Sequence, residues 1–372
     1  MSGGGDAPLR VLHTEASLGW GGQEIRVLTE ARGVARRGHA VTLAAPAEAR
    51  IFQEAPAYGV DAVALPIGRK GVGGVLALRA LFGRERFDVV NTHSSTDTWL
   101  AALACRARAG APALVRTRHI SAPLPANAPT RWLYTRATDR IVTTGEKLRE
   151  QMLRETGIEP ARVVSIPTGI DLARFAPGDR AAARARLGLD TAAPLVGIVA
   201  TLRSWKGHRY LLQALAAMPR SDVRAVIVGD GPQREALEAL VRELGLGERA
   251  LFAGNQADVA PWMQALDVFC LPSYANEGVP QALMQAMACG LPVVTTPVGS
   301  IEEIITDGTT GVLVPPEDAV RLREALERLL GDAKARAALG ARAAAIARER
   351  FGEERMVERM IAVFEQAARR HG

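Results

Sequence analysis

The chain has 372 residues, a length that favours two domains over one core. Hydrophobic residues make up 48% and charged residues 23%, a balance typical of globular proteins. No run of about 18 apolar residues indicates a membrane span. Residues 1–8 lack the basic and apolar regions of a signal peptide, so we expect a flexible leader and a cytoplasmic protein. The three cysteines (Cys105, Cys270 and Cys289) have no close spacing, which argues against both a disulfide framework and a zinc site.

Basic residues are concentrated in the first half. Residues 1–178 carry 23 Lys and Arg against 16 Asp and Glu, a net charge of +7, whereas residues 179–372 carry 23 against 24, a net charge of −1. A basic half suits nucleic acid, anionic lipid or an acidic substrate. The chain has no helix-turn-helix, zinc-finger or aromatic RNA-binding signature, so we do not expect nucleic acid as a partner.

Strand and helix patterns alternate along the first half. An apolar run at residues 9–13 is typical of a buried strand, a glycine-rich turn follows at residues 19–22, and a helical pattern covers residues 23–37. Further strand patterns lie at residues 41–45, 87–91, 113–117, 140–144 and 163–167. This alternation predicts a parallel sheet with helices on its faces.

The same cycle restarts after Pro177 and Gly178, which predict a linker. Strand patterns follow at residues 195–200, 225–229, 251–253, 268–271 and 292–295, and a long helical pattern at about 321–364 breaks near residues 350–352. We predict an α/β protein of two doubly wound, Rossmann-like domains facing each other across a cleft. The first is residues 1–177 with a C-terminal helix (about 352–372) packed back on it, and the second is residues 178–351. Ligands of such sheets bind at the carboxyl ends of the strands.

The most informative segment is residues 277–294, which reads as a loop, a short helix and a strand. The loop supplies backbone N–H groups at a helix N-terminus, which favour phosphate or hydroxyl oxygens. Glu277 can accept hydrogen bonds from sugar hydroxyls, and Gln285 lies eight residues later, about two helical turns on. A packing element with an incidental acidic residue is the alternative.

This segment resembles the signature of the retaining glycosyltransferase family 4, which has the GT-B fold. The similarity extends to residues 298–304 and 307–314 and covers nearly the whole chain. The resemblance implies that Glu277 holds hydroxyls of the donor sugar, and that the loop from Gly278 to Leu283 binds the sugar and diphosphate (Gly278, Val279, Pro280, Gln281, Ala282 and Leu283). At the family's second acidic position this chain has Gln285, a neutral partner for the ribose hydroxyls.

A second segment, residues 199–208, places Lys206 in a glycine-bearing loop after a strand. Its charge suits a diphosphate leaving group. The family has Arg five residues earlier, where this chain has Thr201, and Arg203 is expected to supply that cation. A solvated basic turn is the alternative.

The turn at residues 19–24 resembles the family's glycine-rich loop, which implies that Gly21 and Gly22 approach the donor phosphate and that Glu24 lies on the acceptor side. A tight turn without a ligand is the alternative. The glycines lack the spacing of a nicotinamide-binding turn.

Two histidines follow strands of the first domain. His119 matches the family's cleft histidine that touches the reacting sugar, and His93 is expected near the acceptor, although a lone loop histidine is more often structural. We expect no metal and no cofactor, and the chain has no Asp-x-Asp triplet.

Together these features predict a retaining, metal-independent glycosyltransferase whose catalytic residues are Lys206, Arg203, Glu277 and His119. The expected donor is a UDP-sugar, with GDP- and ADP-sugars as alternatives. The expected acceptor is a lipid-linked or surface-glycan precursor, such as one for lipopolysaccharide. Residues 68–86 mix basic and apolar residues and suit either an ordinary helix or peripheral contact with an anionic inner membrane. A sugar-nucleotide epimerase and a non-catalytic sugar-nucleotide-binding protein are the competing functions.

Overall fold

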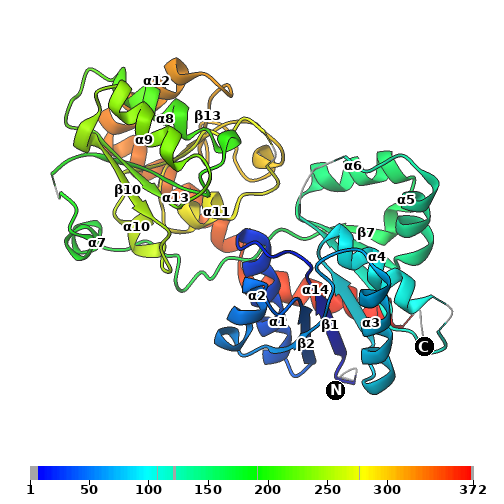
Figure 1. Cartoon of the computed structure of the whole chain (residues 1–372). Coiled ribbons are helices and arrows are strands. Elements are labelled where there is room, and N and C mark those ends of the chain that lie inside the picture. Colours follow the sequence, from blue (N-terminus) through cyan, green and yellow to red (C-terminus); the bar gives the residue numbers. More distant parts are fainter. Residues whose placement is uncertain (1–6, 107, 120–122, 191, 276, 370–372) are drawn as a thin grey trace. The chain divides into compact units, whose positions relative to one another are not determined.

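The computed structural model describes residues 7–106, 108–119, 123–190, 192–275 and 277–369, so most of the expected leader lies outside the described residues. The chain divides into two compact units, Met1–Gly169 with Glu353–Gly372 and Ile170–Gly352 (Figure 1). The division precedes the expected linker at Pro177 and Gly178, because Ile170 and Phe175 are buried in the core of the second unit.

The first unit contains a seven-stranded parallel sheet in the order β3-β2-β1-β4-β5-β6-β7. Its strands are β1 (Arg10–Thr14), β2 (Ala40–Ala45), β3 (Asp61–Ala64), β4 (Val89–Thr92), β5 (Ala113–Arg118), β6 (Arg140–Thr143) and β7 (Val163–Ser165). Its helices are α1 (Gly22–Arg36), α2 (Arg50–Glu54), α3 (Val72–Arg84), α4 (Ser95–Cys105), α5 (Ala128–Trp132), α6 (Glu146–Thr156) and α14 (Glu353–Ala368). Strand β3 is missing from the sequence prediction; it has only four residues, and both end residues, Asp61 and Ala64, are exposed.

The C-terminal helix α14 belongs to this first unit and packs against α1 (Figure 1). A side chain at Gly33 of α1 would lie 2.3 Å from a methyl group of Val357, so the absence of a Cβ there allows the two helices to approach closely.

The second unit contains a six-stranded parallel sheet in the order β10-β9-β8-β11-β12-β13. Its strands are β8 (Leu195–Val199), β9 (Arg224–Val228), β10 (Ala250–Gly254), β11 (Val268–Leu271), β12 (Val293–Thr295) and β13 (Val312–Leu313). Its helices are α7 (Arg180–Leu187), α8 (His208–Ala216), α9 (Arg234–Glu243), α10 (Ala260–Gln264), α11 (Gln281–Ala288), α12 (Ala319–Gly331) and α13 (Ala333–Arg350).

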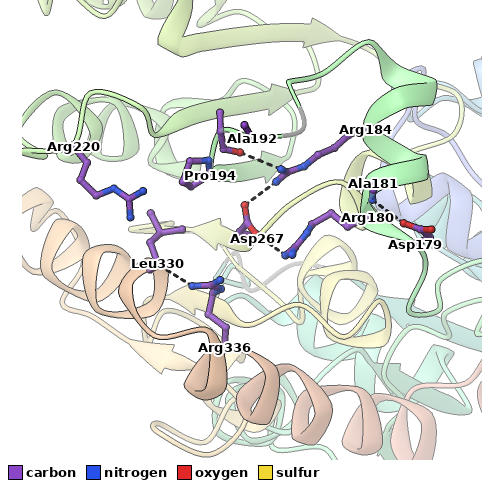
Figure 2. A pocket seen from close by; sticks show the side chains of 11 residues that line it. Asp179, Arg180, Ala181, Arg184, Ala192, Pro194, Arg220, Asp267, Leu330 and Arg336 are labelled. Atoms are coloured by element: carbon purple, nitrogen blue, oxygen red, sulfur yellow. Dashed lines mark hydrogen bonds and ion pairs between the residues drawn. The ribbon is translucent and has the colours of Figure 1, made fainter.

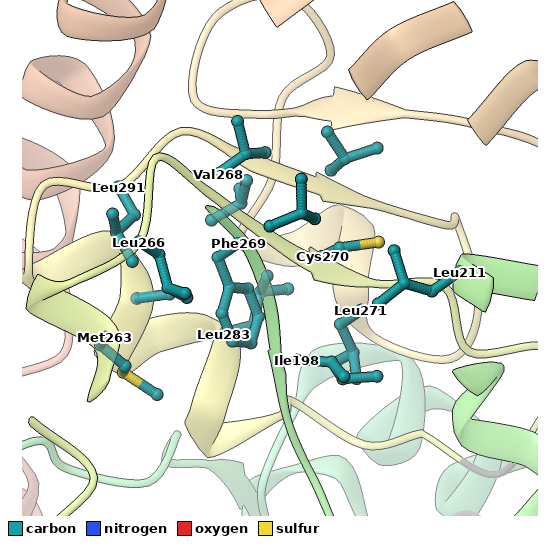
Figure 3. Packing of buried hydrophobic residues seen from close by; sticks show 14 of the residues in the cluster. Ile198, Leu211, Met263, Leu266, Val268, Phe269, Cys270, Leu271, Leu283 and Leu291 are labelled. Atoms are coloured by element: carbon teal, nitrogen blue, oxygen red, sulfur yellow. The ribbon is translucent and has the colours of Figure 1, made fainter. Parts of the chain in front are cut away.

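A continuous apolar core holds the second sheet to its helices. Figure 3 shows Phe269 and Leu271 of β11 together with Leu283 of α11, all three of which are almost completely buried. The helical pattern predicted at 321–364 is three helices, because Asp332 ends α12 and its carboxylate caps the start of α13. In the part of the chain that is described, no helix is long and apolar enough to cross a membrane.

Candidate active site

Both sheets reverse their strand order at one point, and the candidate residues gather there. In the first unit the reversal lies between β1 and β4, and in the second between β8 and β11. Parallel α/β sheets bind ligands at the carboxyl ends of the strands beside such a switch point. Lys206 follows β8 and Glu277 follows β11, whereas His93 follows β4. The topology therefore supplies one candidate region in each unit.

In the second unit, Lys206 and Glu277 form an ion pair. The Lys206 Nζ donates to Glu277 Oε1 at 2.7 Å, and the Ser273 hydroxyl donates to the same oxygen at 2.6 Å. The Glu277 side chain is only 4% exposed and that of Lys206 is 21% exposed. Among the described residues, both hydrogen bonds of the Glu277 carboxylate are to Oε1, so Oε2 remains available to a ligand hydroxyl. The structure thus brings together two residues that lie far apart in the sequence.

Two glycines allow the loops around this ion pair to touch. Gly207 has φ +77°, and a Cβ there would lie 1.9 Å from the Pro272 carbonyl oxygen. Gly299 has φ +61°, and a Cβ there would lie 1.9 Å from the Glu277 carbonyl oxygen. Only glycine fits such close approaches in a left-handed conformation. The loops after β8 and β12 therefore fix the backbone on both sides of Glu277.

Arg203 does not join the ion pair. Its guanidinium lies over the Trp205 ring at 5.6 Å, and the residue is exposed. Thr201, at the position where the family has Arg, is also exposed. Arg203 follows the same strand as Lys206, so its role as a second cation stays a prediction.

Only the second half of the segment from Glu277 to Gln285 is helical. Helix α11 begins at Gln281, so Glu277 lies in the preceding loop and Gln285 sits one turn into the helix. Pro280 precedes the helix without a side-chain cap. Because first-turn N–H groups have no acceptor within a helix, the α11 N-terminus offers donors to an anion beside Glu277.

The glycine-rich turn of the first unit leads into α1. Gly21 precedes the helix, Gly22 is its first residue, and Glu24 is buried in its first turn. The neighbouring Glu15 is fully buried and accepts hydrogen bonds from the Gln23 amide (2.5 Å) and the Ser17 N–H (2.8 Å). Burial, and secondarily the charge of Asp97, raise the pKa of Glu15 to about 8.

Three histidines form a hydrogen-bonded chain at the ends of β1, β4 and β5. His13 Nδ1 lies 3.0 Å from His93 Nε2, and His93 Nδ1 lies 3.0 Å from His119 Nε2. His13 and His93 are buried, whereas His119 is partly exposed. Burial lowers the pKa of His13 to about 3 and places those of His93 and His119 well below the usual value, so the three rings are neutral.

Because the three rings are neutral, the two hydrogen bonds that link them have a defined donor-to-acceptor direction. Each neutral ring carries one N–H, so both contacts must run the same way. If His119 donates inward, the His13 Nε2–H is left buried without an acceptor, since that atom has no hydrogen-bond partner. If His13 donates outward, its Nε2 is only an unused acceptor, which is the less costly arrangement in a protein interior. We therefore infer that His119 accepts from His93 and presents its Nδ1–H as a donor.

His13 and Glu15 are absent from the sequence prediction. His13 lies within β1 and Glu15 directly follows it, but one polar residue near a strand end gives little signal alone. The order β1-β4-β5, which places His13, His93 and His119 on adjacent strands, is the information that would have identified His13.

A separate cavity of about 560 Å³ lies near the opposite edge of the second sheet, before β8 and β11 begin. Figure 2 shows Arg180 and Arg184 of α7 directed at Asp267, with which they form ion pairs at 2.6 and 2.7 Å. Asp267 also accepts from the Leu195 N–H at 2.8 Å. These contacts attach α7 to the sheet, a structural role.

Comparison with known proteins decides the family. The model of Glycosyltransferase Family 4 matches residues 20–174, and that of Glycosyl transferases group 1 matches residues 179–345. The D-inositol 3-phosphate glycosyltransferase of Mycobacterium sp. (strain KMS) is 32% identical over 350 residues, which cover 83% of this chain and 78% of that protein. The chain belongs to the family 4 glycosyltransferases.

Other similarities agree with membership of this family. The D-inositol 3-phosphate glycosyltransferase of Xylanimonas cellulosilytica is 31% identical over an alignment that covers 94% of this chain and 93% of that protein. The crystal structure of Anabaena HepE with UDP-glucose has a TM-score of 0.85 at 22% identity, over 96% of this chain and all of that one. That structure confirms the predicted GT-B fold.

Proposed function

We propose that this glycosyltransferase moves a sugar from a UDP-sugar to a hydroxyl of a surface-glycan or lipid-linked acceptor, with retention of configuration. The Lys206–Glu277 ion pair carries the proposal, because it sets a cation and a sugar-binding carboxylate side by side at the switch point of the second sheet. The solved complex of HepE with UDP-glucose supports UDP as the nucleotide.

In this proposal the second unit binds the donor. The first-turn N–H groups of α11 and the Lys206 ammonium neutralise the diphosphate as the glycosidic bond breaks. Arg203 rotates away from Trp205 to provide the second positive charge. Glu277 accepts hydrogen bonds from the sugar hydroxyls through its free Oε2, and Gln285 bonds the ribose.

The first unit provides His119 and the acceptor site. His119 donates its Nδ1–H to a hydroxyl oxygen of the transferred sugar and so orients the ring. The acceptor hydroxyl attacks from the face that the diphosphate leaves, which retains configuration, and its proton passes to a phosphate oxygen of the departing UDP. Side chains provide all the positive charge in this scheme, so it needs no metal ion.

The acceptor is proposed to be anionic or to lie at a membrane surface. The relatives named above act on an inositol phosphate, and the first half of this chain carries the excess positive charge. Val72 (74% exposed) and Leu76 (58% exposed) project from α3 close to Arg69 and Lys70. This face suits contact with anionic lipid on the cytoplasmic side of the inner membrane.

Thr201 and Gln285 favour one competing function, a protein that binds a sugar nucleotide without transferring the sugar. A thermal-shift comparison of UDP-, GDP- and ADP-sugars identifies the donor, because a tight ligand raises the melting temperature. UDP release in the presence of acceptor extracts then tests turnover. We expect Lys206→Met to abolish turnover. Donor binding without turnover in any acceptor mixture would support the binding protein, and an epimerised sugar nucleotide formed without acceptor would support an epimerase.

A further inference from the structure

The Arg116 guanidinium is buried, and two of its nitrogen atoms have no hydrogen-bond partner among the described residues. The residue is 5% exposed, and its Nε and Nη1 atoms are buried with no hydrogen bond. The Arg116 backbone is paired with β4 and β6, so the missing contacts are those of the side chain. A buried charge is costly unless hydrogen bonds or an opposite charge compensate it, so this guanidinium requires an acceptor.

Another buried arginine of the same chain shows the usual arrangement. Arg184 is 4% exposed and donates to the Ala265 carbonyl (2.8 Å), the Ala193 carbonyl (3.1 Å) and Asp267 Oδ2 (2.7 Å). Arg184 therefore has a structural role, whereas Arg116 bears the cost of burial without these contacts.

The strand register shows which way Arg116 points. Arg116 of β5 is paired with Thr92 of β4, and residues paired in adjacent parallel strands face the same side of the sheet. The Thr92 hydroxyl contacts the Thr98 hydroxyl of α4 at 3.0 Å, so this side faces α4. Arg118, two residues later on the same face, is already hydrogen-bonded to Tyr134.

The opposite charge on α4 nearest in effect to Arg116 is Asp97, and both of its carboxylate oxygens already accept two hydrogen bonds each. Asp97 Oδ2 accepts from the Thr14 hydroxyl and the His93 N–H, both at 2.8 Å. Asp97 Oδ1 accepts from the N–H (2.7 Å) and the hydroxyl of Ser94. A carboxylate has about four lone-pair sites, so these four donors leave none for Arg116.

We propose that Arg116 and the first turn of α4 form an oxyanion site that holds the phosphate group of the acceptor. Helix α4 has eleven residues, and its Asp97 N–H is capped by the Ser94 hydroxyl. The N–H groups of Ser95 and Thr96 have no acceptor within the helix, and together with the helix dipole they add to the guanidinium. A phosphate oxygen supplies the missing acceptor, and arginine binds such groups through paired N–H donors. The inference rests on the proposed function, in which the first unit binds the acceptor.

The test measures how inorganic phosphate changes the melting temperature of the full chain, with saturating UDP present to fill the donor site. Phosphate is expected to stabilise the wild type and to bind Arg116→Met at least about tenfold more weakly, because the charge-assisted hydrogen bonds are lost. Arg116→Lys, which keeps the charge without the paired donors, is expected to fall between them. Arg184→Met is the matched control, because it also removes a buried arginine but should leave the phosphate response unchanged.

The melting temperatures without phosphate separate a binding role from a structural one. Arg116→Met should lower the melting temperature less than Arg184→Met, because it breaks no side-chain hydrogen bond among the described residues and loses only the attraction between Arg116 and Asp97, whereas Arg184→Met breaks three hydrogen bonds. The proposal is overturned if the wild type does not respond to phosphate, or if Arg116→Met keeps the response. Stabilisation by UDP is read separately in every protein, so failure of the donor assignment is distinguishable from failure of this site.

Discussion

The ion pair between Lys206 and Glu277 should respond unequally to removal of its two members. Lys206→Met leaves the Glu277 carboxylate buried with only the Ser273 hydroxyl as donor. Removing one partner of a buried pair costs roughly 3–5 kcal/mol, and because the Lys206 side chain is 21% exposed we reduce this to about 2–3 kcal/mol. Glu277→Gln should cost only about 1 kcal/mol, because the freed ammonium can turn to solvent.

The double variant should be less damaged than the sum of the single variants, since it leaves no unpaired charge. Differential scanning calorimetry measures this effect, because 1 kcal/mol lowers the melting temperature of a unit of this size by about 2–4 °C. We expect Lys206→Met to lower the melting temperature more than Glu277→Gln, and the double variant to recover part of the loss. Equal losses for the two single variants, or strictly additive losses, would refute the inferred burial of the carboxylate.

Four further outcomes are expected. Gly299→Ala should lower the stability measured by circular dichroism more than Gly308→Ala. Both glycines have positive φ, which costs alanine about 1–2 kcal/mol of strain, but only at Gly299 would the added Cβ meet a backbone oxygen. Equal losses of stability would contradict this. The pKa of His13 is about 3 in the folded protein, so below about pH 6.5 the unfolded chain binds more protons than the folded one. The free energy of unfolding should therefore fall as the pH falls from about 6.5 towards 3, and His13→Leu should weaken this acid sensitivity. Nitrogen-15 NMR of His119 should show the proton on Nδ1, not Nε2. Gln285→Glu should bind UDP about three- to tenfold more tightly by calorimetry, and unchanged affinity would remove Gln285 from the ribose site.

The sequence predicts the repeating strand and helix pattern well, because buried parallel strands are short apolar runs. Residues 268–271, for example, match β11 as observed. Strand β13 has only two residues, too few to give a pattern, and the break at Asp332 lies within a continuous helical periodicity. Element types therefore followed from local residues, whereas short edge strands depended on pairing with a neighbour.

The candidate residues were predictable from motifs, but their contacts were not. Lys206 and Glu277 were each identified, yet their ion pair depends on the adjacency of β8 and β11. His13 lies 80 residues before its partner His93. The isolation of Arg116 became visible only when the donors around Asp97 could be counted.

A crystal structure of the full chain with UDP tests the central claim most directly. We predict that the diphosphate lies at the N-terminus of α11, with the Lys206 ammonium in contact with a phosphate oxygen. UDP bound elsewhere, with Lys206 and the Glu277 loop making no contact with it, would contradict the assignment.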